Sequence, residues 1–271
     1  MHGTFCEDGT IQGLLELAEV PYVGCGVLAS AVGMDKDVAK RLAKAADLPV
    51  VPWITITDGA WRSGPAPFVK KIGDDLGYPC FVKPAASGSS VGVHKVKNEA
   101  QLGPAIDDAL RYDGKVLVEK AVSAREIEIA VLENPDPAGA PLTSIAGEIN
   151  ANSQHEFYSY AAKYLDENGA ELLIPAKLDA AKVQEAQRLA AAAFTTLCCE
   201  GMARVDFFLD RHSGAFYFNE VNTIPGFTSV SMYPKLWEAS GIPYGELLSR
   251  LIDLAVTRAA RKRALVRNYA L

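Results

Sequence analysis

A segment around residue 210 has the clearest pattern of apolar and polar positions in the chain. Before it, apolar side chains occupy every second position, so one face of an extended strand is apolar and the other carries Arg204 and Asp206. A polar turn follows, and the next run places Glu220 and Asn222 two residues apart, on one face of a second strand. The pattern predicts a hairpin with polar side chains gathered on one face.

The rest of the chain alternates between runs with helical periodicity and short extended runs, without an internal repeat. This mixture predicts an α+β fold. Helices are predicted at residues 10–18, 35–46, 68–76, 99–110, 179–199, 230–239 and 244–262. Strands are predicted at residues 21–24, 50–57, 80–83, 93–96, 116–119, 125–132 and 142–150.

Composition narrows the class of protein. The 271 residues are 49% hydrophobic, which is ample for a packed core and argues against disorder. A net charge of −6 and a pI near 5.3 argue against nucleic acid as a partner, because neutralising phosphates requires a basic face. A basic run near the C-terminus is expected to be a solvated helix end that complements the helix dipole. The run comprises Arg258, Arg261, Lys262, Arg263 and Arg267.

Cysteine content and hydropathy bear on the compartment. The five cysteines are odd in number and lack zinc-binding spacing, which favours reduced thiols over a disulfide framework. The chain shows no charged-then-apolar leader and no run of about 18 apolar residues. We therefore expect a cytoplasmic protein with no membrane partner.

The polar face of the hairpin has the composition of a metal site. If the strands pair, Asp206, Glu220 and Asn222 offer three oxygen ligands, which suit a hard cation such as Mg²⁺. The alternative is two exposed strand faces that carry these charges by chance. Acidic residues are depleted in strands, so the metal interpretation is favoured.

A loop of small residues between two predicted strands has the composition of a phosphate-binding loop. Its backbone N–H groups can approach phosphate oxygens, and the hydroxyls of Ser87, Ser89 and Ser90 would add donors. Lys83, at the end of the preceding strand, would reach the same phosphates. No Gly-Lys-Ser/Thr sequence precedes a helix, so this is not a Walker loop. A flexible surface loop is an equal alternative for this composition.

Two further segments have weaker signals. The extended junction after Glu119 offers backbone groups to an adenine edge, with Glu126 in reach of ribose hydroxyls; ordinary surface carboxylates are the alternative. The aromatic loop 157–164 is typical of a lid whose Lys163 would contact a terminal phosphate, or of an aromatic patch packed over the core.

An anion site is predicted after the second hairpin strand. Backbone N–H groups at Gly226 and at a helix start near Ser231 would bind a carboxylate or an oxyanion there.

Several separate motifs agree in order and spacing with one known family. They are His2-Gly3-x-x-x-Glu7-Asp8-Gly9, Pro21-Tyr22-Val23-Gly24, Met34-Asp35-Lys36, Lys83 with Ser87-Gly88-Ser89-Ser90-Val91-Gly92, Glu119 with Glu126, Lys163-Tyr164, Arg204-x-Asp206 and Glu220-x-Asn222-Thr223-x-Pro225-Gly226. This set resembles the ATP-grasp fold and, more narrowly, the D-alanine–D-alanine ligase family. The resemblance extends over essentially the whole chain.

The resemblance implies two α+β subdomains that grip ATP, preceded by part of a Rossmann-like domain. Residues 1–33 would be the remnant of this N-terminal substrate domain, 34–118 the central subdomain, and 119–271 the C-terminal subdomain with the metal site and the lid. Family members begin with a complete Rossmann-like domain, whose early glutamate binds the first D-alanine. This chain resembles only its last part and has Cys6 where a glycine is usual.

The resemblance also implies roles for individual residues, with ATP and two Mg²⁺ or Mn²⁺ ions as cofactors. For the nucleotide, it implies Lys36, Lys83, Ser90 and Lys163 on the phosphates, Glu119 and Val122 on the adenine, and Glu126 on the ribose. For the metal ions, it implies Asp206, Glu220 and Asn222. For catalysis and substrates, it implies Arg204 and Gly226 on the oxyanion, Ser89 and Tyr164 near the substrate amines, Ser231 and the Met232 backbone on the second substrate's carboxylate, and His2 near the first substrate.

The implied activity is the ATP-dependent joining of two D-alanines into D-alanyl-D-alanine through an acyl phosphate, for peptidoglycan precursor synthesis. The implied partners are D-alanine and ATP, and a homodimer stays open. One alternative is a nucleotide-binding remnant or scaffold without ligase turnover. Another is an ATP-grasp ligase for a different amino acid or hydroxy acid.

Overall fold

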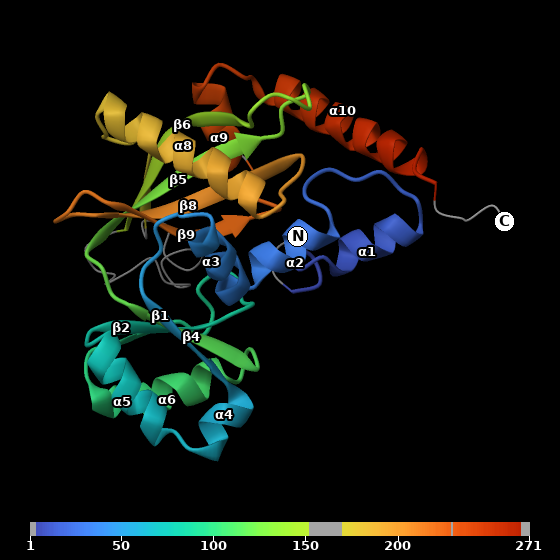
Figure 1. Ribbon diagram of the computed structural model, residues 1–271. Coiled ribbons are helices and arrows are strands. Elements are labelled where there is room, and N and C mark those ends of the chain that lie inside the picture. Colours follow the sequence, from blue (N-terminus) through green and yellow to red (C-terminus); the bar gives the residue numbers. More distant parts are fainter. Residues whose placement is uncertain (1–3, 152–169, 229, 267–271) are drawn as a thin grey trace.

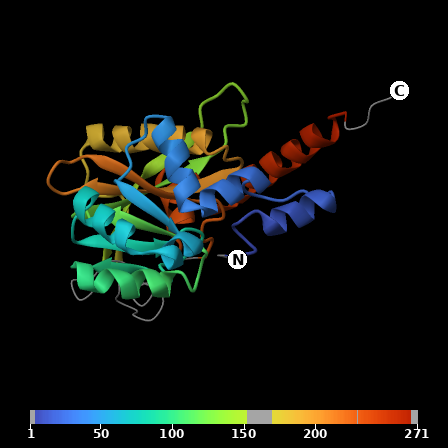
Figure 2. The same ribbon diagram turned by 60° about the horizontal axis from the view of Figure 1, so that its bottom comes forward.

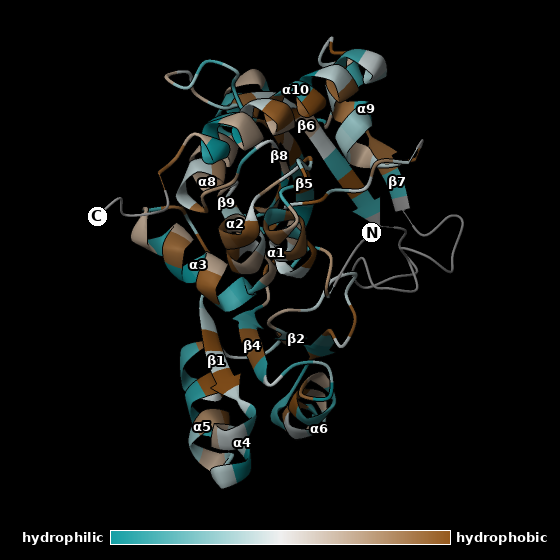
Figure 3. Ribbon diagram, turned by 90° about the vertical axis from the view of Figure 1, so that its right-hand side faces the viewer, coloured by the Kyte–Doolittle hydropathy of each residue, from teal (hydrophilic) through white to brown (hydrophobic). Residues whose placement is uncertain are grey.

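A computed structural model describes residues 4–151, 170–228 and 230–266, and two antiparallel sheets form two layers within that part of the chain (Figure 1). The smaller sheet has the order β1-β4-β2-β3, and α4, α5 and α6 cover one of its faces. Apolar colours run through β1 and β4 (Figure 3). The strands are β1 (Trp53–Thr57), β2 (Cys80–Pro84), β3 (His94–Val96) and β4 (Lys115–Lys120), and the helices are α4 (Asp58–Ser63), α5 (Ala66–Asp75) and α6 (Glu99–Ala109).

Alternation decides which side chains of the smaller sheet face the other layer. Ile56, Val82 and Val118 point into the core beneath the helices. Because successive side chains alternate, Lys83 and Glu119 emerge on the opposite face. That face is directed at the larger sheet (Figure 1).

The larger sheet has the order β7-β6-β5-β8-β9. Odd-numbered residues of β5, such as Ile127 and Ile129, form a core with α8, while Ala130 and Leu132 pack with α9 and α10 at one end of the opposite face. The rest of that opposite face carries polar side chains. The elements are β5 (Ala124–Leu132), β6 (Leu142–Ala151), β7 (Ala170–Leu173), α8 (Ala180–Thr196), β8 (Met202–Asp210), β9 (Phe216–Asn222), α9 (Met232–Ala239) and α10 (Tyr244–Arg263).

Helix α3 (Lys36–Ala45) contacts both sheets and lies between them at one side (Figure 1). Ala39 and Ala43 join the core of the larger sheet. Asp37 accepts hydrogen bonds from Trp53 Nε1 at 3.0 Å and Thr55 Oγ1 at 2.7 Å, both on β1 of the smaller sheet. The helix therefore ties the two layers together.

Helices α1 (Thr10–Leu17) and α10 project from the body on the same side (Figure 2). Arg258, which is only 5% exposed, donates to the carbonyl oxygens of Tyr22 and Gly24. None of the described helices is both long and apolar enough to cross a bilayer. All five cysteines lie in the described residues and are free thiols, as expected.

Each predicted helix is present within a few residues of its expected bounds, and so is each predicted strand except that at residues 21–24. That prediction was wrong, because the carbonyl groups there bind Arg258 instead of a neighbouring strand. The expectation of a solvated basic helix end holds for Arg261 and Arg263, which are exposed in the last turn of α10, but was wrong for Arg258, which is buried. Helix α2 (Val27–Met34), helix α4 and strand β7 were not predicted.

Candidate functional site

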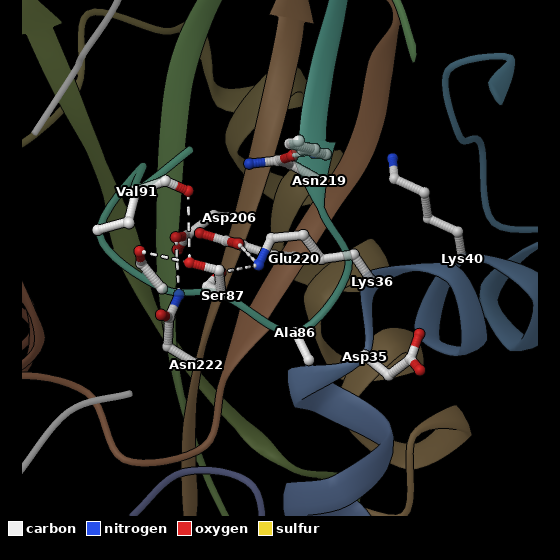
Figure 4. A network of polar contacts seen from close by, with 12 residues as sticks. Asp35, Lys36, Lys40, Ala86, Ser87, Val91, Asp206, Asn219, Glu220 and Asn222 are labelled. Carbon is white, nitrogen blue, oxygen red and sulfur yellow. Dashed lines mark hydrogen bonds and ion pairs between the residues drawn. The ribbon is translucent and has the colours of Figure 1, made fainter. Parts of the chain in front are cut away.

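The hairpin of β8 and β9 brings together the three predicted metal ligands. Asp206 lies directly opposite Glu220, and Arg204 lies opposite Asn222. The Asn222 amide nitrogen donates to Asp206 Oδ2 at 2.8 Å (Figure 4). The predicted convergence of these side chains is therefore present, on the face that looks toward the smaller sheet.

A bulge in β9 makes this arrangement possible. The pairing slips between Asp206 and Phe207, whose partners are Glu220 and Phe218, so Asn219 is the extra residue. Phe218 and Val221 can then both enter the core, while Glu220 faces the site. Strict alternation would have placed Phe218 and Glu220 on the same face.

Arg204 is held between two carboxylates. Its Nε and Nη2 atoms donate to the two oxygens of Asp206 at 2.8 Å each, and Nε lies 3.1 Å from Glu128 Oε2. Burial favours the neutral guanidine, but Asp206 and Glu128 outweigh it and raise the pKa of Arg204. Glu128 was not predicted as a site residue, although β5 pairs it directly with Asp206.

Lys36 connects the hairpin to the small-residue loop. Its ammonium donates to the Ser87 carbonyl oxygen at 2.7 Å and lies 3.2 Å from Glu220 Oε2 (Figure 4). The loop is also anchored at Ala86, whose N–H donates to Asp113 Oδ2 at 2.7 Å. Lys36, a lysine expected to bind phosphate, thus contacts both this loop and Glu220, a candidate metal ligand.

The backbone of the loop adopts conformations that few side chains tolerate. Ser89 and Ser90 both have left-handed φ values, 54° and 58°, and Gly92 has φ 69°. Such conformations are costly for residues other than glycine and occur most often at functional sites. This geometry favours the phosphate-loop interpretation over an ordinary surface loop.

Glu119 does not face solvent but lies between two lysines. Its Oε2 is 2.9 Å from Lys83 Nζ, and its Oε1 is 3.2 Å from Lys40 Nζ. Burial raises the pKa of Glu119, yet the two ammonium groups prevail and the net shift is downward. Lys40 was not predicted as a site residue, because nothing in its helical pattern marks it as fully buried.

The other predicted site residues fall around this centre or outside the described part of the chain. Val122 lies in the junction between β4 and β5, Glu126 is on β5, and Gly226 follows β9. Ser231 is at the N-cap position of α9, where its side chain makes no capping hydrogen bond to the helix, and its Oγ accepts a hydrogen bond from the Thr228 N–H at 3.0 Å. Met232 is the first residue of α9 and is buried. His2, Lys163 and Tyr164 lie outside the described residues.

The donor set at the hairpin fits a hard cation. Two carboxylates and one carboxamide supply oxygen ligands, the type that Mg²⁺ prefers. Within the described ranges, no three histidine, cysteine, aspartate or glutamate side chains gather as a metal-binding group. Because Mg²⁺ prefers octahedral coordination and the hairpin offers three side chains, an ion here would need further oxygens, such as those of a nucleotide's phosphates.

Family comparisons cover nearly the whole chain. The profile described as "D-ala D-ala ligase C-terminus" matches residues 42–253, and that described as "D-ala D-ala ligase N-terminus" matches residues 1–25. The chain is 57% identical over 270 residues to "D-alanine--D-alanine ligase A" of Bradyrhizobium diazoefficiens, covering 100% of this chain and 71% of that protein.

Solved structures show the same arrangement. The D-alanine-D-alanine ligase from Coxiella burnetii is similar with a TM-score of 0.84 and 40% identity, over 98% of this chain and 69% of that one. The VanG D-Ala:D-Ser ligase from Enterococcus faecalis is similar with a TM-score of 0.83 and 38% identity, over 94% of this chain and 71% of that one.

Proposed function

Because this chain belongs to the D-alanine–D-alanine ligase family, with the ATP-grasp fold, we propose that its two facing sheets form the ATP-binding and acyl-transfer part of the ligase site. The activity is the ATP-dependent joining of two D-alanines into D-alanyl-D-alanine, a precursor of peptidoglycan. The observation that supports the proposed site best is the convergence of Asp206, Glu220 and Asn222 beside Arg204 and Lys36.

The nucleotide lies between the two sheets in this proposal. Lys36 and Lys83 bind its phosphates together with the Ser90 loop, and the junction at Val122 receives the adenine. Glu119 meets the adenine from the end of β4 in this proposal, with its carboxylate between Lys40 and Lys83. Glu126 binds the ribose. Lys163, which is outside the described residues, is the third lysine proposed for the phosphates.

The first chemical step is attack on the γ-phosphorus by a carboxylate oxygen of the first D-alanine. The new O–P bond forms as the bond from the γ-phosphorus to the β–γ bridging oxygen breaks, which releases ADP. Lys36, Lys83 and Arg204 offset the negative charge that two approaching anions bring together. The product is an acyl phosphate.

In the second step, the amine of the second D-alanine attacks the acyl carbon. A tetrahedral oxyanion forms, collapse breaks the C–O bond to phosphate, and the amine nitrogen loses a proton. Arg204 and the Gly226 N–H stabilise this oxyanion. The guanidinium has five N–H donors, more than Asp206 and Glu128 use. Ser231 and the Met232 backbone hold the second substrate's carboxylate, and Ser89 lies near the amines. The roles proposed for Tyr164 at the amines and for His2 at the first substrate fall on residues outside the described ranges.

Asp206, Glu220 and Asn222 would hold Mg²⁺ or Mn²⁺, and two such ions would supply positive charge to the phosphate oxygens. The proposed compartment is the cytoplasm, where ATP is available. A homodimer is the proposed assembly.

The test is product formation by the purified chain. We expect ADP release that depends on D-alanine, with D-alanyl-D-alanine detected by mass spectrometry. Parallel reactions with D-serine or D-lactate in place of the second D-alanine identify the acceptor. ADP formation with no D-alanyl-D-alanine, or with a D-serine product alone, would contradict the proposal.

A further inference from the structure

Lys40 is a charged residue in the interior of the protein. It lies one helical turn after Lys36 on α3 and has no exposed surface. Burial of an ammonium group is expensive unless the group is paired and hydrogen-bonded. Lys40 Nζ donates to the Phe218 carbonyl oxygen at 3.4 Å and lies 3.2 Å from Glu119 Oε1.

Glu119 connects Lys40 to Lys83 at the candidate site. Its second oxygen is 2.9 Å from Lys83 Nζ, which also donates to Asn219 Oδ1 at 3.3 Å. Lys40, Glu119 and Lys83 belong to α3, β4 and β2, and Asn219 is the bulge residue of β9. The contacts therefore form a closed link between the two sheets, and Figure 4 shows the Lys40 amine on the Asn219 side of the site.

We propose that Lys40 is a positioning residue that sets the ammonium group of Lys83 for the nucleotide phosphates by sharing Glu119 with it. The inference rests on the proposed function, because Lys83 is a phosphate ligand only if the site binds ATP. Lys40 itself touches no substrate in this proposal.

The charge balance gives the physical reason. Two ammonium groups share one carboxylate, so Glu119 cannot neutralise Lys83 fully while Lys40 is charged. If Lys40 loses its charge, Glu119 interacts with Lys83 alone and draws that ammonium away from an anionic ligand. Affinity for the nucleotide then falls.

The environment of Lys40 makes this loss observable near neutral pH. Burial lowers the pKa of Lys40 to about 8, against the opposing effect of Glu119 on β4. That value already includes the effects of Lys83 on β2, which lowers the pKa, and of Glu220 on β9, which raises it. The positive charge is thus present at pH 7.5 and largely lost at pH 9.

The test is ADP affinity measured by calorimetry without divalent ions, at pH 7.5 and pH 9. We expect the wild-type chain to bind several-fold more weakly at pH 9. Lys40→Met should bind about tenfold more weakly than wild type at pH 7.5, the scale of one charged hydrogen bond, with no further loss at pH 9. Lys40→Arg stays charged and should keep its affinity at both pH values.

Lys44→Met is the matched control, since Lys44 is exposed on the same helix; it should behave like wild type. If Lys40→Met or Lys40→Arg lost as much ADP affinity between pH 7.5 and pH 9 as the wild-type chain does, the proposal would be overturned. If Lys40→Met does not fold, the Lys40→Arg comparison decides alone. A wild-type chain that binds no ADP would contradict the proposed function and this inference together, whereas normal binding by Lys40→Met would contradict only the inference.

Discussion

Arg204 donates two hydrogen bonds of 2.8 Å to the two carboxylate oxygens of Asp206, which lies two residues further along the same strand. The residue proposed to bind a cation is thus already engaged by a cationic side chain. A metal ion that approaches Asp206 must compete with this bidentate pair, which is among the stronger charged contacts in proteins.

This competition predicts that metal binding depends on the nucleotide. Asp206, Glu220 and Asn222 provide few ligands, so Mn²⁺ should bind weakly alone and at least about tenfold more tightly with ADP, whose phosphates complete the coordination. Electron paramagnetic resonance of free Mn²⁺ measures both affinities. Asp74→Asn, an exposed change on α5, should not alter them. Equal Mn²⁺ affinity with and without ADP would refute this prediction.

Substitution of Glu119 should destabilise the protein more than substitution of Lys40. Glu119→Gln leaves two buried ammonium groups without a counter-ion, which should cost about 3–5 kcal/mol of unfolding free energy. Lys40→Met leaves Glu119 still paired with Lys83 and should cost only about 1–2 kcal/mol. Urea unfolding of both variants at pH 7.5 provides the comparison. A larger loss of unfolding free energy in Lys40→Met than in Glu119→Gln would contradict this prediction. It would show that Glu119 is not needed to balance the charges of Lys40 and Lys83.

Glu128→Gln should slow turnover without weakening ATP binding. Glu128 lies 3.1 Å from Arg204 and helps to hold its guanidinium, so we expect kcat to fall about tenfold, less than for the loss of an oxyanion donor itself. Glu126→Gln, two residues earlier on β5, is the matched control and should raise KM for ATP instead. A rise in KM with unchanged kcat for Glu128→Gln would argue against its positioning role.

Gly92→Ala should distort the loop that is proposed to bind phosphate. A Cβ atom at this position would lie 2.6 Å from Tyr112 Cδ2, and the φ of +69° is unfavourable for alanine. We expect a loss of about 1–3 kcal/mol in stability and weaker ADP binding. Gly103→Ala is the control, because its Cβ meets nothing within 4 Å on α6 and should stabilise that helix slightly. Thermal unfolding and ADP titration of the pair decide the matter.

The polar face of the hairpin was predictable because it depends on local alternation. Arg204 and Asp206 share a parity on β8, and Glu220 and Asn222 share one on β9, so pairing alone brings them together. The seven predicted helices also follow from local periodicity, whereas α2 and α4 were not predicted.

The features that the sequence did not reveal depend on contacts between distant segments. The bulge at Asn219 follows from the need to bury both Phe218 and Val221, and no turn residue marks it. The burial of Lys40 requires β4 and β9 to close over α3. The carbonyl groups of Tyr22 and Gly24 accept hydrogen bonds from Arg258, more than two hundred residues away in the sequence. The strand predicted at residues 21–24 is therefore absent.

The central claim is that the β8–β9 hairpin forms the metal and phosphate end of a D-alanine ligase site. Its most direct test is phosphate release by the wild-type chain and by Asp206→Ala, with ATP, Mg²⁺ and D-alanine, beside Asp74→Ala as control. We predict D-alanine-dependent release by wild type and by the control, and a decrease of at least about a hundredfold for Asp206→Ala. Equal release by wild type and Asp206→Ala would contradict the account.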